Sequence, residues 1–144
     1  MLSRVPHPYA VEDARRWLAL VAEDHATGRS IHLAITEGGK LIGVISLEDY
    51  RGNSHFGYWL ARPYWGRGFA TEAATALLRH VFEALPVERI GSCVFAENAA
   101  SLRVQEKLGF RQIGAHRAMC LARNSEVDDI DTALEKKRFL ELNR

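Results

Sequence analysis

The stretch HFGYWLARPYWGRGFATEAATALL, residues 55–78, decides the fold. It opens with the aromatic and apolar content of a β-strand. Pro63, Gly66 and Gly68 then mark a loop, and from Phe69 onward small and apolar residues recur at helical spacing. A strand that runs through a glycine loop into a helix places the unpaired N–H groups of the helix start at the end of the strand. Such groups can bind an anion such as phosphate.

The residues before this stretch predict a helix and an antiparallel meander. Glu37-Gly38-Gly39-Lys40 separates two apolar runs, which is typical of a hairpin turn. The helix carries an apolar stripe of Trp17, Leu18, Val21 and Ala22. The expected elements are a helix over residues 11–26 that Gly28 stops, and strands over residues 31–36, 41–47 and 55–60.

The residues after the loop predict helices and strands in alternation, then a run of short strands. The first helix has a predicted buried face of Ala70, Ala73, Ala74, Leu77, Leu78, Val81 and Leu85. The expected elements are a helix over residues 69–85, a strand over 90–95, a helix over 99–108 capped by Gly109, strands over 110–113, 117–121 and 130–134, and a tail over 135–144 that fits a strand end or a helix. This order predicts a mixed α/β, α+β-like sheet with one parallel crossover around the glycine loop.

Length and composition indicate one domain over residues 1–144. The chain has 19 Lys and Arg against 18 Asp and Glu, and this net charge of +1 argues against a protein that coats nucleic acid or an anionic membrane. No apolar run approaches the roughly 20 residues of a membrane helix, and the first residues lack the apolar core of a signal peptide. Cys93 and Cys120 lie far apart, so we expect no disulfide framework and a reducing cytoplasm.

The glycine loop by itself does not establish a ligand. It lacks the Gly-Lys-[Ser/Thr] ending of a nucleoside-triphosphate loop, and its spacing falls short of a dinucleotide fingerprint. Alone, it favours a tight strand-to-helix turn without a ligand. Asn98 is likewise explained as the N-cap of the helix that follows it. Together, however, the two places put helix starts and polar groups at one edge of the sheet, where open α/β sheets bind ligands.

On these residues the sequence resembles the GNAT superfamily of N-acetyltransferases, and within it the RimJ/RimL-type ribosomal-protein acetyltransferases. Tyr64 to Ala73 is similar to the Tyr-Trp-Gly-x-Gly-Tyr-Ala-Thr-Glu-Ala loop of that subgroup, with Trp65 where the superfamily has Gln or Arg. Further matches are Gly57-Tyr58-Trp59-Leu60, Asn98 with Ser101, and Lys107-Leu108-Gly109-Phe110. The resemblance covers roughly Pro8 to Gly114 and implies a GNAT fold, in which an antiparallel meander precedes a β-α-β-α unit around a central twisted sheet. The N-terminal strand and helix that family members carry before Pro6-His7-Pro8-Tyr9 would be missing.

The resemblance implies an acetyl-CoA-dependent enzyme that moves the acetyl group directly to a primary amine, such as a protein N-terminal α-amino group or a small-molecule amine. Three explanations of the missing front are left open: a miscalled start codon, a trimmed domain, or a partner chain that supplies the missing edge. A homodimer is left open as well. The alternative is a non-catalytic acyl-CoA-binding module. It is supported by the missing first strand and by Gln105, which stands where the family often has a tyrosine acid and cannot donate a proton as an acid. A metal site is not expected, because His7, His25, His32, His80 and His116 show no ligand spacing.

Carried over residue by residue, the family motif predicts a cofactor site in and beside the loop. Pyrophosphate would lie on the backbone N–H groups of residues 67–71. The pantetheine arm would run along Leu60 and Ala61, where a backbone N–H would polarise the thioester carbonyl. Asn98 would bind pantetheine amides and Arg103 a phosphate, whereas Trp65 is expected to anchor the loop or the core. The cofactor-binding set is Leu60, Ala61, Gly66, Arg67, Gly68, Phe69, Ala70, Thr71, Asn98, Ser101 and Arg103.

Ser101 and His55 are the predicted catalytic residues. Ser101 would stand near the CoA sulfur and donate a hydrogen bond or a proton to the leaving thiolate, directly or through water; the alternative is an ordinary serine in a first helical turn. His55, with an unperturbed pKa near ~6.5, suits the base that keeps the amine neutral; the alternative is a surface histidine at a strand edge. Glu48 and Asp49 are weaker candidates, because a solvated turn explains them. Cys93 is expected in the core.

Overall fold

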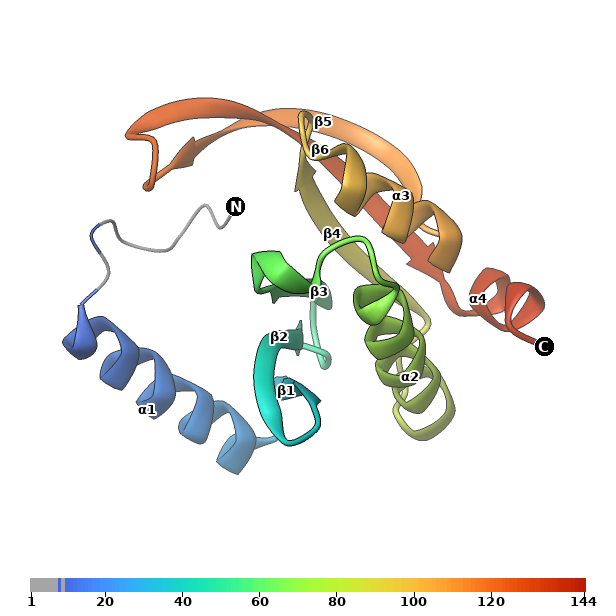
Figure 1. The fold of residues 1–144 in the computed structure, drawn as a ribbon. Helices are drawn as coiled ribbons and strands as arrows, with labels where there is room; N and C mark the ends of the chain where they lie inside the picture. The colour runs from blue at the N-terminus through green and yellow to red at the C-terminus, as the bar shows by residue number, and fades with distance from the viewer. Residues whose placement is uncertain (1–7, 9) are drawn as a thin grey trace.

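The computed structural model describes residue 8 and residues 10–144, and its strands form a six-stranded sheet (Figure 1). They lie in the order β1-β2-β3-β4-β6-β5, with β3 and β4 parallel and the other neighbours antiparallel. The predicted mixed α/β architecture with one parallel crossover is confirmed. The strands are β1 (Ile31–Glu37), β2 (Lys40–Glu48), β3 (His55–Leu60), β4 (Arg89–Phe95), β5 (Arg111–Cys120) and β6 (Ser125–Glu135).

The meander β1-β2-β3 forms as the sequence predicts, because the turn residues and the alternation of apolar residues both favour the same strands. Gly38 and Gly39 have φ values of 56° and 80°, the left-handed pair that a two-residue hairpin turn requires. β3 begins and ends at the predicted residues. The ring of Phe56, which is 1% exposed, lies 5.6 Å from that of Phe110 between centroids. This contact fixes the meander to the second half of the sheet.

Helices α2 (Phe69–Ala84) and α3 (Ala99–Leu108) cover one face of the sheet, called here the helix face. α3 ends at Gly109 with φ 102°, the predicted left-handed cap. The side chains that α2 buries join one apolar cluster with those of β2, β3, β4 and α3. Each fully buried leucine or phenylalanine in it contributes about 1.5–3 kcal/mol. The buried residues of α2 are Ala74, Leu77, Leu78, Val81 and Phe82, which confirms most of the predicted face.

The C-terminal hairpin is longer than predicted. β5 is continuous where two pieces were expected, β6 begins at Ser125 rather than at residue 130, and the tail forms the helix α4 (Lys136–Leu142). The prediction was wrong for two physical reasons. The register between the strands shifts between Gln112 and Gly114, which breaks the alternation, and nearly all of β5 is exposed or half-buried, so no apolar face marks it.

Helix α1 (Val11–Thr27) stops at Gly28 as predicted, but its apolar stripe is not in the core. Trp17 and Leu18 are exposed, and α1 has no buried residue. Its main contact is with β1, where the ring of Trp17 lies 5.9 Å from that of His32. Figure 1 shows α1 at one end of the molecule, apart from α2, α3 and α4. Within the described part of the chain, no helix is long and apolar enough to cross a membrane.

The segment Pro6–Tyr9, where the resemblance to family members begins, lies outside the described residues except for Pro8. The same holds for His7. The predictions for these positions therefore stay predictions.

Candidate functional site

Strands β3 and β4 diverge soon after they meet. They pair only at His55 and Gly91, and the backbone N–H of Gly91 donates to the carbonyl of Ser54 at 2.9 Å. Towards their carboxyl ends the two strands therefore leave a splay, in which the inner edge of β3 is not hydrogen-bonded to β4. A splay of this kind exposes backbone groups that an extended ligand can bind.

Alternation decides which residues of β3 face the splay. The N–H of Ala61 donates to the carbonyl of Ile42 on β2 at 2.8 Å, so odd-numbered residues of β3 point their backbone groups to β2. The backbone groups of Tyr58 and Leu60 point to β4 and the splay. The predicted pantetheine contacts at Leu60 and Ala61 stay predictions: the backbone of Leu60 points to the splay, whereas the N–H of Ala61 already bonds β2. Tyr58 was not predicted.

The glycine loop at the end of β3 has room and donors for an anion. Gly66 and Gly68 have φ values of 70° and 83°, and a Cβ at either position would meet nothing within 4 Å. The first helical N–H of α2 that reaches a carbonyl is that of Glu72, which donates to Gly68 at 3.0 Å. Among the described residues, the N–H groups of residues 66–71 have no backbone acceptor outside the helix. The predicted residues Phe69, Ala70 and Thr71 therefore present free helix-start donors, which fits a pyrophosphate.

Two side chains hold this loop against the sheet. The indole N–H of Trp65 donates to the carbonyl of Leu60 at 2.6 Å, and its ring is 58% exposed. Trp65 is thus a loop anchor, as expected, and not a core residue. Arg67 reaches Glu37 at 3.5 Å, and its guanidinium lies 4.9 Å from the ring centroid of Phe69. These contacts orient the loop, while its backbone stays available.

The start of α3 faces β3 across the helix face. The Asn98 side chain accepts the N–H of Ser101 at 3.1 Å, which confirms the N-cap interpretation. The Ser101 hydroxyl accepts a hydrogen bond from the hydroxyl of Tyr58 at 3.2 Å. Burial raises the pKa of the Tyr58 phenol and the bond to Ser101 opposes this, so the phenol stays protonated at neutral pH. Arg103 is exposed on α3, and no hydrogen bond or ion pair among the described residues joins it to the loop.

Gln105 lies in the core rather than in the splay. It is 3% exposed, its amide donates to the hydroxyl of Ser92 at 2.8 Å, and its carbonyl accepts the hydroxyl of Thr132 at 2.6 Å. The Ser92 hydroxyl in turn donates to the carbonyl of Phe56 at 2.8 Å. Gln105 therefore joins α3 to three strands and has a structural role.

His55 lies on the face of the sheet opposite the helix face. It is exposed, and its Nε2 atom is 4.0 Å from Sγ of Cys93. The prediction of a core position for Cys93 was wrong, because Cys93 is exposed. Along β4 the neighbours Ser92 and Val94 turn inward at 6% and 5% exposure, so Cys93 points to the other face.

A row of titratable side chains continues from His55 across this face, and we call it the titratable band. Asp131 on β6 is the register partner of Cys93, and its carboxylate lies 3.0 Å from Nδ1 of His116 on β5. His116 also approaches Asp129, with 3.7 Å between Nε2 and the carboxylate. No local motif reveals this row, since its members come from separate strands. The band consists of His55, Cys93, Asp131, His116 and Asp129.

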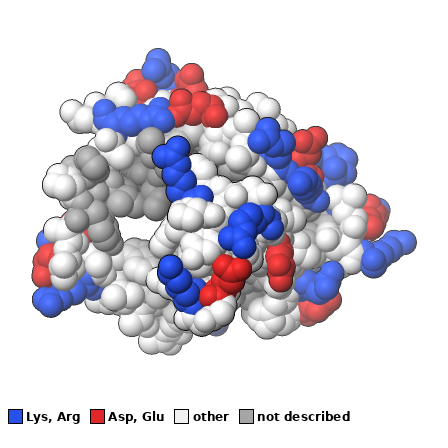
Figure 2. Space-filling view, in the orientation of Figure 1, with Lys and Arg blue, Asp and Glu red and all other residues white. Residues whose placement is uncertain are grey.

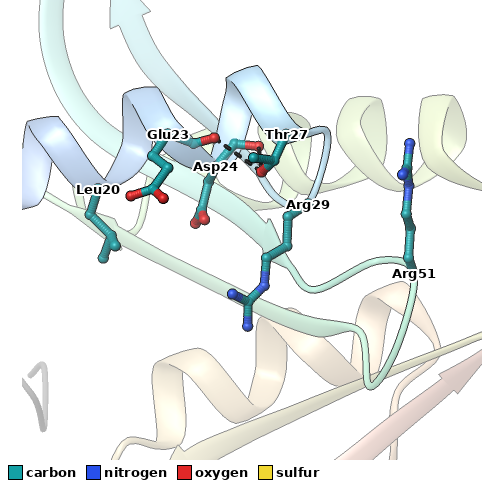
Figure 3. Close-up of a pocket in the computed structure, with 6 residues that line it drawn as sticks. All are labelled: Leu20, Glu23, Asp24, Thr27, Arg29 and Arg51. Carbon is teal, nitrogen blue, oxygen red and sulfur yellow. Dashed lines mark hydrogen bonds between the residues drawn. The ribbon is translucent and has the colours of Figure 1, made fainter.

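A separate cavity of about 350 Å³ lies at the C-terminal end of α1 (Figure 3). Part of its polar lining is engaged: the hydroxyl of Thr27 donates to the carbonyl of Glu23 at 3.0 Å (Figure 3). Arg29 pairs with Asp49 at 3.9 Å. It shares no residue with the loop or the band. No group of three metal-ligating side chains gathers anywhere among the described residues. The lining residues are Leu20, Glu23, Asp24, Thr27, Arg29 and Arg51.

The geometry of splay, glycine loop and α3 agrees with the comparison to known families. Residues 1–111 match the acetyltransferase (GNAT) domain model. The chain belongs to the GNAT family. It is 32% identical, over 94% of its length and 76% of the other protein, to the SPbeta prophage-derived uncharacterized N-acetyltransferase YokL of Bacillus subtilis. It is 31% identical to the putative ribosomal N-acetyltransferase YdaF of Bacillus subtilis, over 65% of this chain and 52% of that protein.

A solved structure carries the same fold. RimJ of Mycobacterium smegmatis in complex with CoA-disulfide superposes with a TM-score of 0.79 at 24% identity, over 94% of this chain and 71% of that chain. By the family model and the YokL match, the chain is a GNAT N-acetyltransferase that depends on acetyl-CoA.

Proposed function

We propose that this GNAT protein transfers the acetyl group of acetyl-CoA directly to a primary amine, bound on the side of the titratable band. The observation that carries the proposal is the convergence of three groups at the splay: the donors of residues 66–71, the backbone of Tyr58 and Leu60, and the Tyr58–Ser101 hydroxyl pair. Acetyl-CoA supplies an activated thioester, and the chain's own residues bind it, orient it and move protons.

The backbone of the loop binds the anionic end of the cofactor. The N–H groups at the start of α2 and the helix dipole both favour pyrophosphate, so no extended basic surface is needed. Figure 2 agrees with this, since Lys and Arg are interspersed with Asp and Glu on the face that it shows. The N–H groups of Tyr58 and Leu60 are the donors that hold the pantetheine arm and polarise the thioester carbonyl.

The Tyr58–Ser101 pair serves the leaving group. When the amine nitrogen bonds to the acetyl carbon and the carbon–sulfur bond breaks, the sulfur leaves as a thiolate that needs a proton. Ser101 donates it, and Tyr58, which already donates to Ser101 at 3.2 Å, replaces it. Gln105, the residue that favoured a non-catalytic module, is bonded in the core and does not take part.

His55 serves the amine. The nucleophile must lose a proton, and an α-amino group with a pKa near ~7.7–8.0 does so more readily than a lysine with a pKa near ~10.4. His55 is exposed on the band side, where it can accept that proton. A protein N-terminus is therefore the acceptor favoured by chemistry, and the name of YdaF points the same way. A cytoplasmic site of action and a homodimer stay predictions.

A two-stage experiment tests this function. Acetyl-CoA should raise the melting temperature, since a ligand that binds only the native state stabilises it by mass action. Thiol release is then measured with a peptide that has a free N-terminus, the same peptide with a blocked N-terminus and free lysine, and butylamine; mass spectrometry locates the acetyl group. No thermal shift at millimolar acetyl-CoA contradicts the cofactor site. A shift without amine-dependent thiol release contradicts catalysis and leaves a binding module.

A further inference from the structure

One buried carboxylate oxygen of the titratable band has no hydrogen bond to the described residues. Asp129 is 4% exposed, and its Oδ1 atom is buried without a hydrogen bond to any described residue. Its other oxygen is 3.7 Å from His116, longer than a hydrogen bond. Buried polar groups are almost always hydrogen-bonded, so an exception indicates a partner that none of the described residues provides. For a carboxylate oxygen, that group is a donor.

The surroundings of Asp129 make the missing donor a cation. Burial raises the pKa of the Asp129 carboxyl, His116 opposes this, and the neighbouring charge of Asp131 adds to it. His116, 47% exposed at its side chain, lies between the two carboxylates and supplies at most one positive charge for two negative ones. A further positive group would balance the cluster and satisfy Oδ1 at once.

The cluster also lies on the side of the sheet where the proposed function places the acceptor. Asp129 and Asp131 are the register partners of Phe95 and Cys93 on β4. Cys93 is within 4.0 Å of His55, the proposed base. The band therefore leads from the base on β3, across β4, to the carboxylates on β6.

We propose that Asp129, together with Asp131 and His116, forms a subsite for a positively charged group of the acceptor, so that the preferred acceptor carries a second cation near the amine that is acetylated. This inference rests on the proposed function and deepens it. Ammonium and guanidinium groups supply the N–H donors that Asp129 lacks. A small diamine and a basic side chain next to a peptide N-terminus offer this same chemistry.

Binding to the protein saturated with CoA tests the subsite without turnover, because CoA has no acetyl group to transfer. Two matched pairs are titrated by calorimetry: α,ω-diaminobutane against butylamine, and the peptide Ala-Lys-Ala against Ala-Gln-Ala. In at least one pair, the member with the extra cation should bind about tenfold or more tightly. Asp129→Asn and the half-exposed Asp131→Asn should each abolish that preference while the affinity for CoA is kept.

Asp128→Asn is the matched control, since Asp128 is exposed and pairs with Arg117 at 3.7 Å; it should keep the preference. If Asp129→Asn does not fold, Asp131→Asn decides. Equal affinity within both pairs overturns the inference, and so does a preference that survives in the folded variants. A protein that releases no thiol with any amine overturns the proposed function and the inference with it. Amine-dependent release without a preference for the cation overturns the inference alone.

Discussion

The loop end and the titratable band share strand β3 but are built in different ways. The loop end uses backbone: the N–H groups of residues 66–71 and the inner edge of β3 at Tyr58 and Leu60. The band uses side chains, and its five members come from β3, β4, β5 and β6. β3 contributes to both, because its backbone edge faces the splay while His55 faces the other side of the sheet.

This difference in construction suits two tasks, binding of the cofactor at the loop end and binding of the acceptor at the band. A backbone cradle binds what is constant, the phosphates and amides of one cofactor, and it tolerates side-chain changes that keep its conformation. A surface of side chains can be rebuilt one residue at a time, which suits a variable acceptor. Changes at the loop end should therefore abolish cofactor binding, whereas changes on the band should alter turnover or acceptor preference and leave the cofactor bound.

The largest expected effect is at Gly68. We expect Gly68→Val to weaken CoA binding by about a hundredfold or more, because φ 83° is strained for a β-branched residue and the new side chain fills the space of the anion. Gly39→Val is the control, since Gly39 has φ 80° and equally open surroundings but lies in the β1–β2 turn. Calorimetry with CoA measures both. Unchanged affinity in folded Gly68→Val would remove the loop from the cofactor site.

The next effect is on the hydroxyl pair. We expect Ser101→Ala to lower kcat by about tenfold to a hundredfold with little change in the KM for acetyl-CoA, since the pair acts on the leaving thiolate. Tyr58→Phe should lower kcat less, and the double variant should resemble Ser101→Ala, because the two hydroxyls share one hydrogen bond. Fully additive losses would show that they act separately.

A smaller effect is expected on the band side. His55→Ala should lower kcat by about tenfold near neutral pH and should leave the Kd for CoA unchanged, since His55 does not face the splay. His80→Ala, at an exposed position of α2, is the control. At high pH, where the amine is neutral without help, the loss should shrink. A loss of the same size at every pH argues against His55 as the base.

The smallest effect concerns stability. Because the pKa of Asp129 is raised in the folded state, the native protein binds more protons than the unfolded chain between the two pKa values, and its stability falls as pH rises through that window. Asp129→Asn lacks this dependence. The free energy of unfolding of both proteins is measured by denaturation from about pH 4 to about pH 7. As the pH rises, the variant should become more stable relative to the wild type. A constant difference would mean that the carboxyl is not perturbed.

The sequence was sufficient to predict those features whose residues are neighbours in the chain. The β3–loop–α2 stretch, the Gly109 cap and the Asn98 cap each depend on neighbours in the chain, and they were predicted correctly. Which of the backbone N–H groups at Leu60 and Ala61 faces the splay could not be predicted, because a short strand does not reveal which of its edges is already paired.

The band could not be predicted, because its geometry depends on register. Asp131 meets Cys93 only through the β4–β6 pairing, and it meets His116 only after the shift in register near Gly114. Cys93 was placed in the core because an apolar strand offers no sign of which face is covered. The stripe of α1 was misleading for the same reason, since an amphipathic pattern does not say what lies against it.

The buried Gln105 network constrains how this sequence can evolve. Gln105 bonds both Ser92 and Thr132, so replacing Gln105 removes a hydrogen bond from each of these two buried hydroxyls. A tyrosine side chain at position 105 would have to point in another direction, and the hydroxyls of Ser92 and Thr132 would then lose their hydrogen bonds to that position. Across relatives we therefore expect positions 92, 105 and 132 to covary, so that a natural change at one is accompanied by changes at the other two.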